Sequence, residues 1–343
     1  MKPSLRGSAK QSYINIFKNL KFVYFMEFKE LKDRKILVTG GAGFVGSNLS
    51  AMILKNGGQV VCFDDLSTGS ERNITDLKAN PNYKFIKGDA NNFDDLKKVF
   101  ADNKFDYVFH YAARVGVIRT IERPLEVLED IQGIRHILEF SKDNGVKKVM
   151  FSSSSEVYGE PVEIPEREDG HLNAKLPYAV VKLVGENFMK SYFQTHGLKT
   201  CSLRFFNVYG PRQDASAYGF VAGIFIKQAL KGESITVFGD GTQTRDFVFV
   251  EDNLNATFKA LFSDVTNGES INIGTGRPIT ILDLAETIIR VTGSKSKIEF
   301  KPFRKDGEIK HRFPDVAKMK RLLDYAPQYT LEDGVRKTLE WYR

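Results

Sequence analysis

The chain has few cysteines for its length: two, Cys62 and Cys201, among 343 residues. Each lies in an apolar run, which is typical of buried thiols and not of a disulfide framework. A chain of this length can bury a large core without disulfides or metals. The sequence therefore gives no indication of an oxidising compartment, and we expect no metal site.

Long hydrophobic runs are also missing from the N-terminal segment. The longest apolar run in residues 1–25 and the following methionine is 22–26, far short of the ~20 residues that a membrane-spanning helix needs. The segment also lacks the apolar core and small-residue cleavage site of a signal peptide. We therefore expect a cytoplasmic protein without a membrane span.

Acidic residues are absent from residues 1–25, and this absence explains most of the net charge of +7. The segment carries five basic residues: Lys2, Arg6, Lys10, Lys18 and Lys21. The rest of the chain is close to neutral, so its charge does not favour a nucleic-acid partner. A basic, aromatic membrane-surface segment is one interpretation of these residues. We prefer the hypothesis that translation starts at Met26, directly before the first predicted strand.

The body of the chain has an ordinary composition, with 42% hydrophobic and 27% charged residues. No internal repeat or low-complexity tract interrupts it. Short β-rich runs alternate with amphipathic segments. They predict strands at 35–39, 59–63, 84–87, 106–110, 147–152 and 199–206, and helices at 44–55, 125–143 and 178–196. This alternation is typical of an α/β fold, a Rossmann-type doubly wound parallel sheet. Residues 209–218 read as a loop, and a smaller mixed α/β region follows.

A glycine-rich motif follows the first predicted strand. Residues 41–46 fit G-x-G-x-x-G, and Gly40 adds an overlapping glycine. In this strand–turn–helix context the glycines allow a tight turn, and the helix N-terminus faces a pyrophosphate. Asp64 ends the second strand, where a carboxylate can bind a ribose 2′-hydroxyl, and Asp65 follows it. Two acids would repel a 2′-phosphate, so the cofactor is predicted to be NAD and not NADP.

A tyrosine and a lysine, Tyr178 and Lys182, lie one turn apart on a predicted helix. The spacing places both on one face, where the ammonium is expected to lower the tyrosine pKa towards neutrality. Such a tyrosine can act as a general base on a sugar hydroxyl. The serine-rich run 152–155 follows a strand, at the sheet edge where ligands bind, and a serine there could share the proton through a hydrogen bond. Taken alone, the spacing of Tyr178 and Lys182 also fits an exposed pair of side chains. The serine run, taken alone, also fits an ordinary polar loop.

Together these motifs resemble the extended short-chain dehydrogenase/reductase family, the NAD-dependent nucleotide-sugar epimerases and dehydratases. The matching segments are TGGAGFVG (39–46), DDLSTG (64–69), KGD (87–89), HYAA (110–113), YAVVK (178–182), LRFFNVYGPRQD (203–214) and FGDGTQTRDF (238–247). So many ordered motifs, spread over roughly residues 35–340, make coincidence an implausible explanation.

The resemblance implies roles by position. Tyr178 would be the base, Lys182 its ribose-binding partner and Ser154 the proton-sharing hydroxyl, with Glu156 as a further catalytic group. Asp89 would lie near the adenine, and Asn207 and Arg245 would bind the diphosphate. The implied cofactor-binding residues are Gly40, Gly43, Phe44, Val45, Gly46, Asp64, Asp65, Asp89, Ala90, Ala112, Ala113, Ser152 and Phe205. The implied substrate-binding residues are Ser155, Asn207, Phe238, Arg245 and Arg312.

Members of the family share one first step, the oxidation of a sugar carbinol to a ketone, and differ in the next. Residues 178–214 are most similar to the 4-epimerases, so a UDP-sugar 4-epimerase (UDP-glucose/galactose or UDP-glucuronate type) is the preferred prediction. However, the triplet 154–156, Ser-Ser-Glu, is more similar to the UDP-glucuronate decarboxylases and to GDP-mannose dehydratase. Arg312 lies in a segment similar to one in which an arginine of the decarboxylases faces the sugar carboxylate. Decarboxylation is therefore the alternative, ahead of 4,6-dehydration and of a non-catalytic NAD sensor.

Glu156 and Arg312 also have plainer interpretations. Glu156 could simply orient Ser154 or a substrate hydroxyl, and Arg312 could bind the diphosphate or cap the surface. The chain also departs from the family pattern at two positions. Asp130 stands where many relatives have asparagine, and Val181 where serine is common; we expect neither to touch the chemistry.

The predicted organisation has three parts: an extension (1–30), an NAD-binding domain (31–206 and 240–265) and a nucleotide-sugar-binding domain (207–239 and 266–343). The resemblance also implies a homodimer that pairs through the helices near residues 125 and 185.

Overall fold

The computed structural model describes residues 26–216, 220–303 and 309–343, without the side chains of residues 117–119. The basic segment 1–25, to which the hypothesis of a start at Met26 refers, lies outside the described residues. So does residue 218, the end of the predicted loop.

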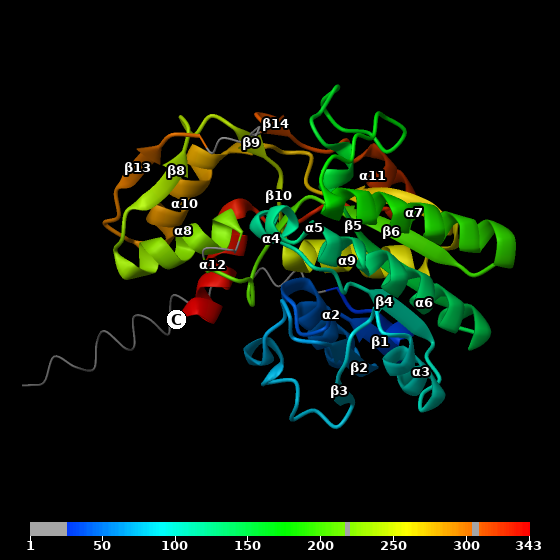
Figure 1. The fold of residues 1–343 in the computed structure, drawn as a ribbon. Helices are drawn as coiled ribbons and strands as arrows, with labels where there is room; N and C mark the ends of the chain where they lie inside the picture. Colours follow the sequence, from blue (N-terminus) through cyan, green and yellow to red (C-terminus); the bar gives the residue numbers. More distant parts are fainter. Residues whose placement is uncertain (1–25, 217–219, 304–308) are drawn as a thin grey trace, which may run out of the picture.

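A seven-stranded parallel sheet forms the centre of the larger part of the molecule (Figure 1). Its order is β11-β6-β5-β4-β1-β2-β3, and every neighbouring pair is parallel. The strands are β1 (Lys35–Thr39), β2 (Gln59–Asp64), β3 (Tyr83–Lys87), β4 (Tyr107–His110), β5 (Lys148–Ser154), β6 (Thr200–Phe205) and β11 (Glu269–Ile273). The predicted doubly wound fold is confirmed, and the strand order reverses between β1 and β4, where such sheets bind ligands.

Helices cover both faces of this sheet because alternate strand residues point to opposite sides. In β1, Ile36 and Val38 join one apolar cluster with α2 (Phe44–Lys55) and α9 (Val250–Phe262). Leu37 joins a second cluster with α3 (Phe93–Ala101), α6 (Asp130–Asp143) and α7 (Pro177–His196). Each face thus has its own buried core. No described helix has both the length and the hydropathy needed to cross a bilayer.

The single helix predicted over 125–143 is two helices in the structure. After α4 (Val117–Glu122), α5 (Pro124–Leu128) is followed by the single residue Glu129, and α6 begins at Asp130. The backbone of Glu129 stays in the right-handed helical region, with φ −60° and ψ −25°, so the axis is interrupted without a loop. Periodicity alone does not reveal such a break.

The smaller part of the molecule contains short sheets and three helices within the described residues. β7 (Asn207–Tyr209) pairs with β10 (Phe247–Phe249), β8 (Ile235–Phe238) with β13 (Ile298–Lys301), and β9 (Thr244–Arg245) with β12 (Ile279–Thr280) and β14 (His311–Arg312). The helices are α8 (Val221–Lys231), α10 (Ile281–Thr292) and α12 (Leu331–Tyr342). A further helix, α11 (Ala317–Leu323), packs against β11 and α9 of the larger part (Figure 1). Strand β11 lies at the edge of the large sheet, although the sequence assigned 266–343 to the sugar-binding domain.

Short 3₁₀ turns complete the described chain: η1 (Lys29–Leu31), η2 (Glu71–Ile74), η3 (Ser155–Tyr158) and η4 (Asp264–Thr266). Turn η3 follows β5 directly, and it carries Ser155 and Glu156.

A buried ion pair links α7 to the sheet. Arg204 on β6 donates from Nε and Nη2 to the two oxygens of Glu186, at 2.8 and 2.7 Å. The same carboxylate accepts from Ser153 on β5 (2.5 Å) and Ser270 on β11 (3.0 Å). Three strands and one helix therefore share this carboxylate, which anchors the helix that carries Tyr178 and Lys182.

Removing one partner of this pair should be costly, because the other charge remains buried. We expect Arg204→Met to lower the free energy of unfolding by about 3–5 kcal/mol. The double variant Arg204→Met/Glu186→Leu should lose clearly less than the single one. Urea unfolding followed by circular dichroism measures both, and equal losses would contradict this account.

Candidate active site

A cavity of about 320 Å³ lies between the large sheet and the smaller part of the molecule. Residues at or after the carboxyl ends of β1 to β6 line it, as do the first turns of α2 and α7. It contains the position where the strand order reverses, the usual ligand site of open α/β sheets.

The glycine turn after β1 forms one wall. Gly40 has φ +68°, and a Cβ there would lie 2.6 Å from the backbone nitrogen of Ala112. A Cβ on Gly46 would lie 2.3 Å from the Gly40 carbonyl oxygen. Helix α2 then begins at Phe44, after the N-cap Gly43, which has no side chain to cap its first amides. The backbone can therefore come close to an anion and donate amides to it, as a dinucleotide pyrophosphate requires.

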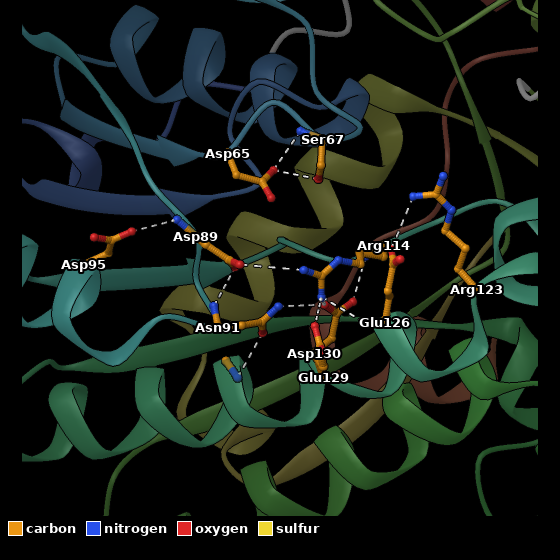
Figure 2. A network of polar contacts seen from close by, with 11 residues as sticks. Asp65, Ser67, Asp89, Asn91, Asp95, Arg114, Arg123, Glu126, Glu129 and Asp130 are labelled. Carbon is orange, nitrogen blue, oxygen red and sulfur yellow. Dashed lines mark hydrogen bonds and ion pairs between the residues drawn. The ribbon is translucent and has the colours of Figure 1, made fainter.

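Asp64 fixes this turn and faces the same cavity. Its carboxylate accepts from the amides of Ala42 (2.9 Å) and Leu66 (2.8 Å), while burial raises its pKa. Asp65 is half-buried and accepts from the amide and hydroxyl of Ser67 at 2.8 and 2.7 Å (Figure 2). Two acids at the end of β2 fit a ribose with a free 2′-hydroxyl, so the donor set suits NAD. Every residue predicted to bind the cofactor lines the cavity.

The four predicted catalytic residues line the cavity as well: Ser154, Glu156, Tyr178 and Lys182. Ser154 lies close enough to the Tyr178 hydroxyl to lower its pKa. The Lys182 ammonium lies 5.4 Å from the Tyr178 ring centre and donates to the Ser152 hydroxyl at 3.3 Å. The structure thus brings together a phenol, a hydroxyl and an ammonium at one place.

The tyrosine pKa differs from the prediction. Burial raises the pKa of Tyr178, and the charges of Glu156 and Asp130 raise it further, whereas the Ser154 hydrogen bond lowers it. Burial also lowers the pKa of Lys182, to about 8. The expectation that Lys182 brings the tyrosine close to neutrality is therefore not met by the protein alone. The desolvation of both groups outweighs their proximity.

The predicted substrate residues fall into two groups. Ser155 and Asn207 line the cavity, whereas Phe238, Arg245 and Arg312 are not among its lining residues. Phe238 ends β8 in the smaller part. Arg245 and Arg312 are paired in register on the adjacent strands β9 and β14, and Arg245 donates to the Thr244 carbonyl at 2.8 Å.

Arg312 is buried behind the cavity wall and bound to Glu156. Its guanidinium donates to the Glu156 carboxylate and, at 2.5 Å, to the Gly159 carbonyl. Its Nε lies 3.7 Å from the buried Glu166, and burial raises the pKa of Glu166 to about 8. Two residues far apart in the sequence, 156 and 312, thus meet directly, and no local pattern could show this.

Sequence reasoning missed a polar network on the cofactor side, centred on Arg114 (Figure 2). Arg114 and Asp130 both line the cavity, with Asn91 and His110. Asp130 was expected not to touch the chemistry; it lines the cavity on the cofactor side, and that expectation stays a prediction. The signal was a carboxylate in place of the usual asparagine, together with an arginine directly after the HYAA segment.

The fold and the cavity define an NAD-binding enzyme of the doubly wound α/β class. Residues 36–274 match the model of the NAD dependent epimerase/dehydratase family, and the chain belongs to this family. The resemblance stated from the motifs is therefore confirmed.

Relatives of different activities match nearly the whole chain. It is 37% identical over 322 residues to the UDP-N-acetyl-alpha-D-glucosaminuronate decarboxylase of Bacillus cytotoxicus, across 90% of this chain and 98% of that protein. The UDP-glucose 4-epimerase of Thermotoga maritima, solved with UDP-glucose, is 35% identical with a TM-score of 0.84 over 90% and 98% of the two chains. The UDP-glucuronic acid 4-epimerase of Bacillus cereus, in complex with UDP-glucuronic acid and NAD, is 35% identical with a TM-score of 0.81 over 90% and 98%.

The glycine turn generates a prediction about the cofactor. Gly46→Ala places a methyl group against the Gly40 carbonyl and should reduce NAD binding at least tenfold, measured by calorimetry on cofactor-free protein. Gly145→Ala is the control for backbone strain outside the cavity: its φ of +68° disfavours alanine, but no atom lies within 4 Å of a Cβ at that position. Unchanged NAD affinity in a folded Gly46→Ala protein would exclude this turn as the pyrophosphate site.

Tyr178 generates a second prediction, on the identity of the base. Tyr178→Phe removes the acidic hydroxyl but keeps the ring, so turnover should fall by about 10²–10⁴-fold. NAD content of the purified variant, measured by chromatography after denaturation, should match that of the wild type. Turnover that persists in the variant would refute the assignment of the base.

Proposed function

We propose that the protein is a UDP-sugar 4-epimerase that works through a 4-keto intermediate. The observation that carries this proposal is the grouping of Ser154, Tyr178 and the Lys182 ammonium in the cavity that suits NAD. A base, a proton-sharing hydroxyl and a cation at one place are what the oxidation of a secondary alcohol needs.

Each residue has one task in this reaction. Tyr178 takes the proton of the sugar C4 hydroxyl, and Ser154 shares it through their hydrogen bond. Lys182, buried next to Ser152, stabilises the phenolate that Tyr178 must become. NAD, when bound, would supply the hydride acceptor for C4, and its positively charged ring would favour the phenolate. Once the 4-keto sugar has turned over, return of the hydride to its other face would invert C4.

Substrate recognition falls to the wall opposite the cofactor. Ser155 and Asn207 line the cavity there, and Asn207 also donates to the Asp246 carbonyl at 3.1 Å. Arg245, Arg312 and Phe238 belong to the smaller part of the molecule. We propose that they complete the nucleotide-diphosphate site from that side. The relatives solved with UDP-glucose and with UDP-glucuronic acid support a UDP-sugar as the substrate class.

A second function, decarboxylation of a UDP-uronate, is favoured by the contact between Glu156 and Arg312. A 4-keto uronate is a β-keto acid and loses carbon dioxide readily. A substrate carboxylate would compete with Glu156 for the Arg312 guanidinium and free Glu156 to act at the sugar. The relative from Bacillus cytotoxicus, named a decarboxylase, supports this alternative.

We further propose that the enzyme works in the cytoplasm as a homodimer. Leu125 on α5 is 77% exposed and Ile121 on α4 is 54% exposed. These apolar side chains lie near one of the two helices through which the family resemblance implies pairing.

One assay distinguishes the two reactions. The protein is incubated with NAD and, in turn, UDP-glucuronate and UDP-glucose, and the products are analysed by mass spectrometry and proton NMR. We expect a product of unchanged mass with inverted C4. Loss of the carboxyl carbon from UDP-glucuronate would establish the decarboxylase instead. The proposed function would be contradicted if the protein converted neither of these sugars and no other UDP-hexose or UDP-uronate.

A further inference from the structure

Arg114 connects three segments at the cofactor side of the cavity (Figure 2). Its Nη1 donates to the Glu126 carbonyl at 2.8 Å and to Asp130 at 3.1 Å. Its Nη2 lies 3.6 Å from Asp89, and Glu129 lies 3.4 Å from Nη1. The guanidinium therefore links the loops after β3 and β4 to the interruption between α5 and α6.

Asp130 is the most buried acid of this network, with 7% of its surface exposed. It accepts hydrogen bonds from the Arg114 amide (2.7 Å), the Arg114 guanidinium (3.1 Å) and the Asn91 side chain (3.0 Å). It is also the first residue of α6, where the helix dipole favours a negative charge. These donors lower the pKa of Asp130 and so oppose burial, which raises it.

The network reaches the catalytic pair through the packing of α6 on α7. Both helices connect neighbouring parallel strands, so they run in the same direction. Gly185 of α7 allows the close approach, because a Cβ there would lie 3.1 Å from the Ile134 side chain of α6. Asp130 lies one turn before Ile134, and Lys182 lies one turn before Gly185. The carboxylate and the ammonium are thus at the same level, and both line the cavity.

We propose that Asp130, with its charge balanced by Arg114, is a positioning residue for the catalytic pair: this ion pair sets the charge that Tyr178 and Lys182 face and so the pH range of the enzyme. The inference rests on the proposed function of Tyr178 as the base. Neither Asp130 nor Arg114 needs to touch the substrate for it to hold.

The charges around the pair give the sign of the effect. Asp130 faces Arg114 and Lys182, and Arg114 also faces Asp89 and Glu129. Tyr178 faces the negative charges of Glu156 and Asp130, which both raise its pKa. His110 also lines the cavity, where its ring stacks on Phe151. It is neutral, since burial lowers its pKa to about 3. Removing the Arg114 charge therefore leaves more negative charge near Tyr178 and opposes the phenolate. Removing the Asp130 charge leaves more positive charge there and favours the phenolate.

The test is the pH dependence of kcat/KM in the NAD-loaded enzyme, whose acid limb reports ionisation of the base. Asp130→Asn removes a negative charge near the pair while the Arg114 charge stays, and it should move this limb to lower pH by roughly 0.5–1 unit. Arg114→Gln removes the positive charge while the Asp130 charge stays, and it should move the limb to higher pH. The double variant restores neutrality and should return the limb close to its wild-type position.

Arg135→Gln is the matched control. Arg135 is an exposed arginine on α6, the helix that begins at Asp130, and it is paired with Glu139 at 3.1 Å. Its loss should leave the pH profile unchanged. Any pattern other than opposite shifts that cancel in the double variant overturns the proposal. If Arg114→Gln does not fold, Asp130→Asn against the double variant decides by the same criterion.

Two further readouts separate charge from structure. Thermal unfolding of the cofactor-free variants measures what the ion pair adds to stability, and NAD content measures what it adds to cofactor binding. A purely structural pair would change these quantities and leave the acid limb unmoved, which also refutes the proposal. If the wild type converts no UDP-sugar, the proposed function fails. If the wild type is active but the acid limbs of all variants coincide with its own, only this inference fails.

Discussion

The burial of an ammonium next to a phenol is the constraint on which the rest of the structure depends. Lys182 is 2% exposed, and an isolated charge at such a position would be costly. Its ammonium lies 4.8 Å from the centre of the Phe151 ring and 3.3 Å from the Ser152 hydroxyl. A cation–π contact, one hydrogen bond and the nearby charge of Asp130 offset part of that cost. What remains appears as the lowered pKa of Lys182 and the raised pKa of Tyr178.

The fold is arranged to keep this pair in place. Parallel strands bring the loops after β1, β4 and β5 to one edge, so that the glycine turn, the Arg114 network and Ser154 meet there. Helix α7 carries the pair, and the buried Glu186–Arg204 contact ties it to the sheet. The same low dielectric that makes Lys182 costly also strengthens every charge that acts on Tyr178.

Local patterns were sufficient for six of the seven strands of the large sheet and for the cofactor wall, but they missed β11. The runs at 35–39 and 59–63 appear as β1 and β2, and the glycines with Asp64 specify a turn whose function depends on neighbours in sequence. The i,i+4 spacing placed Tyr178 and Lys182 on one helix. Contacts between distant segments were beyond such patterns: Glu156 with Arg312, and Arg114 with Asp130. The pKa of Tyr178 was misjudged for the same reason, because burial is a property of the folded chain.

The central claim is that a carbon–hydrogen bond of the sugar is broken and remade inside this cavity. The most direct measurement uses a UDP-sugar labelled with deuterium at C4, incubated with the NAD-loaded protein in ordinary water. The account predicts that the label is recovered at C4 of the epimerised product and does not exchange with solvent, since Tyr178 moves only the hydroxyl proton. Inversion with loss of the deuterium to water would contradict it, because the bond would then have been broken by proton abstraction.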